Sequence, residues 1–213
     1  APAEGTPAQR TIWETVKHHF AVSACILQKD ARIGKIIGFY SVVFAAHTLL
    51  FFYSQQYFAD FGYNKVQISV IMLLVGGASC LGALASAKMY RRFGKRCLIP
   101  ETVIIAGAIL CYGAGKAGVA IAALMCAGFA NAALYPIQSD SLNALIPSEQ
   151  RATLISVDSM CFSIVMIVLF PLAGALADRW GLKTVLLLLG VILLLFLLTV
   201  FCIEKESFSS DHS

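Results

Sequence analysis

Two ionisable side chains inside long apolar stretches are the strongest candidates for chemistry in this sequence. His47 lies near the middle of an apolar span of residues 36–59, and Asp158 lies within a second span of residues 152–177. A charged carboxylate at the centre of a membrane helix costs about 2.5 to 3.5 kcal/mol, so Asp158 should be protonated, paired or hydrated. Histidine titrates near neutral pH and can carry a proton without a large change in its surroundings. Both residues are therefore candidates for proton coupling.

Each of these candidates also has a purely structural explanation. A neutral His47 that bonds to a neighbouring helix needs no function, and Asp158 could make capping contacts with Ser156 or Ser159. Asp158 could equally bond to another part of a larger protein. Because ionisable groups inside a membrane are functional hypotheses by default, both readings stay open.

Uncharged polar side chains form a further set, on single faces of two helices. Asn131, Tyr135 and Gln138 recur at i, i+4 and i+7, and His47 and Phe51 are four residues apart. Polar groups within a bilayer normally face the interior of a helix bundle or a water-filled cavity. Bonds across helices are the alternative explanation. We predict one water-accessible surface lined by Tyr40, His47, Phe51, Gln55, Asn131, Tyr135 and Gln138.

The elements that carry these residues follow from composition and charge spacing. The chain is 59% hydrophobic and 13% charged, whereas soluble proteins are about 25% charged. A bilayer core of ~30 Å requires ~20 helical residues. The charge-poor segments predict an all-α, polytopic membrane bundle of six transmembrane helices. These spans are residues 36–59, 66–87, 97–115 (containing Glu101), 117–139, 152–177 (containing Asp158) and 184–203.

Basic residues are divided unevenly between the two ends of these spans. If both termini lie on one side of the membrane, the opposite side receives only Lys65, Lys116, Arg179 and Lys183 of the 16 Lys and Arg residues. The positive-inside rule then places both termini in the cytoplasm. We expect an integral protein of the plasma membrane.

Three regions are expected along the chain. Residues 1–30 read as a cytoplasmic linker, exposed by cutting a longer chain, and a Thr11/Glu14 capping box begins an amphipathic helix within it. That helix fits either the membrane interface or the surface of a protein partner. Residues 31–205 form the six-helix half-bundle, and residues 206–213 form a cytoplasmic tail.

An internal repeat divides the six spans into two groups of three. The sequence Gly-Ala-Leu-Ala occurs at residues 82–85 and again at residues 174–177, each time between the second and third helices of a group. The two copies fall on opposite membrane faces, as an inverted-topology repeat requires. Chance similarity of small-residue helix ends is the alternative for the tetrapeptide alone.

A charged turn, an apolar helix and a second charged turn together resemble the major facilitator superfamily. In that family a Pro-x-x-x-Arg-Ala-Thr turn leads into a helix that ends in a Gly-x-x-x-Asp-Arg-x-Gly loop. One position departs from the family pattern, since Ser86 stands where the loop after the second helix often has an acidic residue. The matching positions are Pro147, Arg151, Ala152, Thr153, Gly174, Asp178, Arg179 and Gly181.

The resemblance implies the C-terminal six-helix half of a twelve-helix transporter, in which the first and fourth helices line the cavity. In the resembled family the charged turns between helices take part in gating. Membrane topology and contact with lipid head groups are the alternative explanation for the basic residues between 91 and 96. Arg151 is expected to meet Asp140 or Glu149. The residues assigned to gating or topology are Arg91, Arg92, Gly94, Lys95, Arg96, Arg151, Gly174, Asp178, Arg179 and Gly181.

The function expected from these observations is one half of a secondary active transporter that works by alternating access. Its partners would be a small solute, protons, the lipid bilayer and the N-terminal six-helix half of the same transporter. A self-contained six-helix channel or membrane scaffold is the alternative. The seven cysteines form no Cys-x-x-Cys pair, and no phosphate loop or Ser/His/Asp spacing occurs, so we expect no enzyme activity, cofactor, metal site or nucleic-acid binding.

Overall fold

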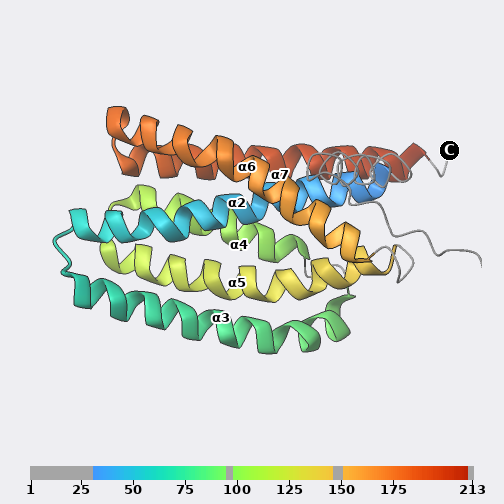
Figure 1. The fold of residues 1–213 in the computed structure, drawn as a ribbon, viewed down its shortest axis with the longest axis horizontal. Coiled ribbons are helices and arrows are strands. Elements are labelled where there is room, and N and C mark those ends of the chain that lie inside the picture. Colours follow the sequence, from blue (N-terminus) through green and yellow to red (C-terminus); the bar gives the residue numbers. More distant parts are fainter. Residues whose placement is uncertain (1–30, 95–97, 146–150, 211–213) are drawn as a thin grey trace, which may run out of the picture.

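Six α-helices and one short 3-10 helix make up the described part of the chain (Figure 1). The computed structural model describes residues 31–94, 98–145 and 151–210, so the expected helix near Thr11 and the basic residues Lys95 and Arg96 lie outside it. The predicted all-α fold is confirmed, and each of the six predicted spans is helical, five of them in helices long and apolar enough to cross a membrane. The helices are α2 (Ala31–Asp60), α3 (Lys65–Phe93), α4 (Leu98–Cys111), η2 (Tyr112–Ala114), α5 (Ala117–Asn143), α6 (Arg151–Trp180) and α7 (Leu182–Ser210).

Most helices are longer than the apolar spans predicted from the sequence, because charged and polar residues at the ends of the spans are also helical. α3 includes Arg91 and Arg92 in its final turn, and α7 continues past residue 205 to Ser210. Five helices are long and apolar enough to cross a bilayer, while the apolar segment Leu98–Ala114 is shorter. At 1.5 Å per residue, that segment reaches only about 25 Å, near the lower limit for a span.

The helix pairs follow the symmetry that two inverted three-helix repeats would produce. α3, the second helix of the first repeat, packs along α5, the first helix of the second repeat. The equivalent pair, α6 and α2, also packs together, and the third helices α4 and α7 contact each other (Figure 1). The second helix of each repeat therefore packs against the first helix of the other repeat.

Small residues allow α3 and α5 to approach each other closely. A Cβ atom added to Gly82 would lie 2.2 Å from the carbonyl oxygen of Phe129, and one added to Gly128 would lie 2.8 Å from Ser79 Oγ. Small residues recur every four positions along this part of α3, and they let membrane helices touch closely, because lipid provides no hydrophobic force between helices. At Gly82 the facing atoms are the backbone of α5.

Hydrogen bonds join the C-terminal part of α2 to η2, the short helix that follows α4. The Tyr57 hydroxyl donates to the Tyr112 carbonyl oxygen at 3.0 Å, and the Ser54 and Tyr112 hydroxyls are 2.7 Å apart. Asn64 and Gln67 then form a capping box that begins α3. These bonds hold α2 in a fixed position relative to the core of the bundle.

The connections α4–α5 and α6–α7 meet at one end of the bundle. The Lys183 ammonium lies so close to Gly115 that a Cβ atom there would be 2.7 Å from Lys183 Nζ. Gly115 and Gly181 have φ angles of 65° and 80°, which favour glycine because a side chain strains this backbone. Both connections therefore lie on the same side, as the alternating direction of the spans requires.

Candidate functional site

A polar hollow of about 340 Å³ lies between α2, α5 and α6. α2 and α5 are the first helices of the two repeats, and α6 carries the ionisable residue that the sequence analysis singled out. The surfaces of the three helices thus combine hydroxyl, amide, carboxylate and aromatic groups. The lining residues are Ser41, Phe44, Thr48, Asn131, Tyr135, Asp158, Ser159, Phe162 and Ser163.

Asp158 is half-buried in the wall of this hollow. Its Oδ1 accepts a hydrogen bond from Gln138 Nε2 on α5 at 3.3 Å. Gln138 itself is only 1% exposed, so the amide supports the carboxylate from behind. No Lys, Arg or His residue lines the hollow within the described part of the chain, and a neutral amide is a weak substitute for a counter-charge.

Two polar atoms at the hollow have no hydrogen-bond partner within the described residues. They are Ser41 Oγ and Asn131 Oδ1, and both atoms are buried. A buried polar atom without a partner costs about 1 to 3 kcal/mol, so such atoms indicate places where water or a ligand bonds. Thr48 and Ser163 instead donate to carbonyl oxygens one turn back on their own helices.

Aromatic rings form the apolar part of the wall. The rings of Phe44 on α2 and Tyr135 on α5 have centroids 5.7 Å apart, and Tyr40 stacks on Phe44 from the buried side at 5.9 Å. Tyr135 is 56% exposed, so this bundle leaves the hollow open at its surface. Phe162 contributes a third ring, one turn after Asp158.

The seven residues predicted to share one surface are divided by the structure. Asn131 and Tyr135 line the hollow, Gln138 lies behind Asp158, and Tyr40 is buried behind Phe44. The remaining three, His47, Phe51 and Gln55, do not line it.

These three residues lie outside this hollow, so a single surface that includes them stays a prediction. The stripe of α2 that faces the hollow is Ser41, Phe44 and Thr48. Consecutive helical residues are rotated by about 100°, so His47 points away from the direction of Thr48. The Nε2 atom of His47 is buried without a hydrogen-bond partner in the described structure.

The residues assigned to gating or topology lie mostly at helix ends. Arg91 and Arg92 are exposed in the last turn of α3, and Gly94 caps that helix. Arg151 is exposed at the start of α6, and no ion pair joins it to Asp140 within the described residues.

The second charged turn is shorter than the motif had implied. Gly174, Asp178 and Arg179 belong to the continuous helix α6, and only Gly181 separates that helix from α7. The Tyr53 hydroxyl on α2 approaches Gly174 and donates to the Phe170 carbonyl oxygen at 3.1 Å. Gly174 therefore serves helix packing in this structure, and the expected loop around it is corrected.

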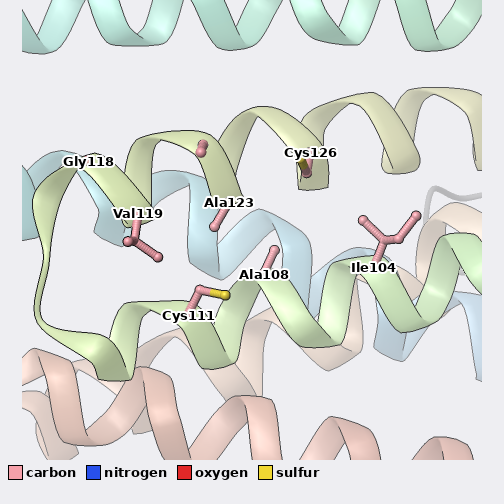
Figure 2. Close-up of a pocket in the computed structure, with 8 residues that line it drawn as sticks. Ile104, Ala108, Cys111, Gly118, Val119, Ala123 and Cys126 are labelled. Atoms are coloured by element: carbon pink, nitrogen blue, oxygen red, sulfur yellow. The ribbon is translucent and has the colours of Figure 1, made fainter.

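A second hollow of about 460 Å³ between α4 and α5 has a different chemistry (Figure 2). Its wall consists of small and apolar side chains such as Ile104, Ala108 and Val119, with Cys111 and Cys126 as its sulfur atoms. It offers no charge and no strong hydrogen-bond donor, so a polar solute would gain little there. The polar hollow is the better candidate for solute binding.

Glu101 is the ionisable residue whose burial the sequence did not reveal. It is 1% exposed on α4, and neither carboxylate oxygen has a hydrogen-bond partner among the described residues. It lies outside both hollows. No group of three His, Cys, Asp or Glu side chains in the described part of the chain could hold a metal ion.

The family model of the Major Facilitator Superfamily matches residues 2–157 and, in a second alignment, residues 37–211. The chain belongs to the major facilitator superfamily. Members of this superfamily are membrane transporters and not enzymes, and the long apolar helices agree with an integral membrane protein that meets lipid and a solute. Comparisons with curated proteins and with solved structures gave no match.

Residues of the hollow that the sequence analysis did not select nevertheless left a signal. Ser159 and Ser163 are four residues apart, and they flank Asp158 and Phe162 on one side of α6. A search for polar residues on the same helical face as Asp158 would have found both. Asp158 lies in the same wall, so the polar face of α6 comprises Asp158, Ser159 and Ser163 together.

Proposed function

We propose that this chain forms one six-helix half of an alternating-access transporter and that the polar hollow is its part of the solute pathway. The observation that supports this proposal best is the cluster of an uncompensated carboxylate and unpartnered polar atoms inside a membrane bundle. Polar groups in such positions are costly unless water or a solute meets them. The hollow lies against both first helices of the repeats, where inverted-repeat transporters bind their solutes.

The open side of the hollow is the side that a second half would close. The exposed ring of Tyr135 and the apolar surface of α6, including Ile164, Ile167 and Val168, lie on this bundle without a covering helix among the described residues. We propose that the N-terminal half of the same transporter covers this surface. In the proposed orientation, both termini face the cytoplasm across the plasma membrane, and the turns carrying Arg91 and Arg151 lie on that side.

Sided labelling of one cysteine tests alternating access. Ser163→Cys, in the full-length protein with all native cysteines replaced, including the seven of this chain, places a thiol in the hollow. We expect a membrane-impermeant thiol reagent to reach it from both sides, with the ratio between sides changing when a gradient of solute or protons is imposed. Ser69→Cys on α3 is the control, because Ser69 is an exposed serine that bonds one turn back, as Ser163 does.

Two labelling results would contradict the proposal. If Ser163→Cys reacts from one side under every gradient, then the hollow is not an alternating pathway. If it reacts equally from both sides at all times, then a permanently open channel explains the chain better. The Ser69→Cys control should react from one side only in every case, because Ser69 lies near the start of α3, one turn after Lys65.

We propose that Asp158, and not His47, carries the coupled proton. Asp158 touches the hollow and has an amide partner that can bond to either protonation state, whereas His47 lies outside the hollow. Substrate-induced proton flux in Asp158→Asn and His47→Gln variants of the full-length protein tests this assignment. Unchanged stoichiometry in Asp158→Asn would contradict it, and loss of coupling in His47→Gln alone would transfer the role to His47.

A further inference from the structure

The charges of the hollow narrow the chemical class of solute that it can hold. Asp158 is the one charged side chain in its wall among the described residues, and its hydrogen-bond partner is the neutral amide of Gln138. Between their charged ends, the six spans contain no Lys or Arg residue. An anionic solute would thus meet no positive charge in this bundle. A cationic solute would meet the carboxylate of Asp158, which has no positively charged partner among the described residues of the wall.

The hydrogen-bonding atoms of the wall favour the same class. Ser41 Oγ and Asn131 Oδ1 are buried without a partner, and Asn131 Oδ1 is an acceptor, as are the oxygens of an ionised Asp158. A solute that fits these atoms must supply N–H or O–H donors. A protonated amine supplies up to three N–H donors and the positive charge in one group.

The aromatic groups of the wall provide a second means of recognising a cation. Phe44 and Tyr135 lie side by side with centroids 5.7 Å apart, and Phe162 follows Asp158 by one helical turn. The face of an aromatic ring attracts an ammonium group, by about 0.5 to 2 kcal/mol depending on desolvation. A carboxylate beside such rings is a combination that suits organic cations better than sugars, which need no counter-charge.

We propose that the polar hollow selects solutes that carry an ammonium group, with Asp158 as the counter-charge and the rings of Phe44 and Tyr135 as the surrounding wall. The solute class rests on the proposed function, since it concerns the same hollow. The volume of the polar hollow, about 340 Å³, lies at the small end of the range for ligand pockets, about 300 to 1,000 Å³. The fitting solutes are therefore small protonated amines, or quaternary ammonium compounds that also carry a hydroxyl donor.

Thermal unfolding of the purified full-length protein tests this proposal with probes of known charge. The cationic probes are choline, triethyl(2-hydroxyethyl)ammonium and benzyl(2-hydroxyethyl)dimethylammonium, each of which carries a hydroxyl donor and a positive charge that does not titrate. The charge controls are 3,3-dimethylbutan-1-ol and 3,3-dimethylbutanoate, which match the branched end of choline but are neutral and anionic. A ligand that binds the folded state raises the unfolding temperature by mass action. We expect at least one cation, and neither control compound, to raise it.

Two carboxylate variants identify the binding site. Asp158→Asn keeps the size of the side chain and should weaken cation binding by about tenfold or more, which corresponds to ~1.4 kcal/mol. Glu101→Gln is the matched control, since Glu101 is a buried carboxylic acid of another helix that lies outside the hollow. Its cation-induced shift should equal that of the unmodified protein.

The outcomes separate the solute class from the proposed function. The ammonium proposal is overturned if no cation stabilises the protein, if a neutral or anionic control stabilises it equally, or if Asp158→Asn retains the full shift. In each of these cases, sided labelling of Ser163→Cys still reports whether the hollow alternates. Failure of that labelling overturns the transport pathway itself, whatever the cations do.

Discussion

Replacing Gly82 by alanine should separate two helices that now touch through their backbones. A Cβ atom at this position would lie 2.2 Å from the carbonyl oxygen of Phe129 and 2.9 Å from its carbonyl carbon. Carbon atoms in favourable contact are about 3.5 to 4.0 Å apart, so α3 and α5 would have to move apart by roughly 1 Å. The obstacle is main chain, which cannot rotate away as a flexible side chain can.

The expected cost follows from two opposing terms. Forcing extra atoms into a well-packed contact typically costs about 1 to 3 kcal/mol, and a rigid obstacle favours the upper part of that range. Alanine also improves helix propensity over glycine by up to about 1 kcal/mol. Gly76→Ala on the same helix isolates this second term, because nothing lies within 4 Å of a Cβ atom there. The difference between the two variants therefore measures the collision.

The assay is thermal unfolding of both variants in one detergent, together with the monodisperse fraction after purification. We expect Gly82→Ala to unfold at a lower temperature than the unmodified protein and to yield less monodisperse material. Gly76→Ala should match or slightly exceed the unmodified protein. Equal stability of the two alanine variants would refute the backbone contact between α3 and α5.

Other substitutions test single bonds in the bundle. Tyr57→Phe removes the bond from α2 to the backbone of η2 and should cost about 1 kcal/mol in thermal unfolding, whereas Tyr90→Phe at an exposed site should cost nothing measurable. Gln138→Leu leaves Asp158 without its hydrogen-bond donor and should destabilise the protein by up to about 2 kcal/mol. A second substitution, Asp158→Asn, should partly remove this loss. Additive losses in the double variant would contradict coupling between the two residues. Arg151→Ala should change the sidedness of thiol labelling more than it changes expression, because the side chain is exposed; lost expression with unchanged transport per molecule would contradict this.

The sequence predicted the six helices well because one physical quantity determines them. A bilayer tolerates few charges, so the distances between charged residues mark the spans, and the connections follow. Helix ends were less certain. The predicted loop around Gly174 proved to be helical, because a motif of turn-forming and charged residues can also occupy the last turns of a long helix at a solvated border.

The face that each helix turns to the cavity was harder to predict than the helix itself. Sequence reasoning chose the stripe of α2 that contains His47, yet the hollow is lined by Ser41, Phe44 and Thr48. Both stripes carry polar residues, and a rotation by about 100° separates neighbouring positions. Only the packing of α2 against α5 and α6 decides between them, and that packing depends on residues far away in the chain.

The two equivalent helix pairs explain why the polar hollow lies where it does. In the pair α3 and α5, Gly82 and Gly128 bring the backbones into contact and leave no space for a solute. In the symmetry-related pair α6 and α2, aromatic side chains and the Tyr53 hydroxyl hold the helices instead, and the polar hollow lies where this pair meets α5. The same repeat has thus produced one sealed contact and one open contact. Because side-chain contacts can be exchanged more readily than backbone contacts, we expect conformational change to occur at α6 and α2 while α3 and α5 move as one body.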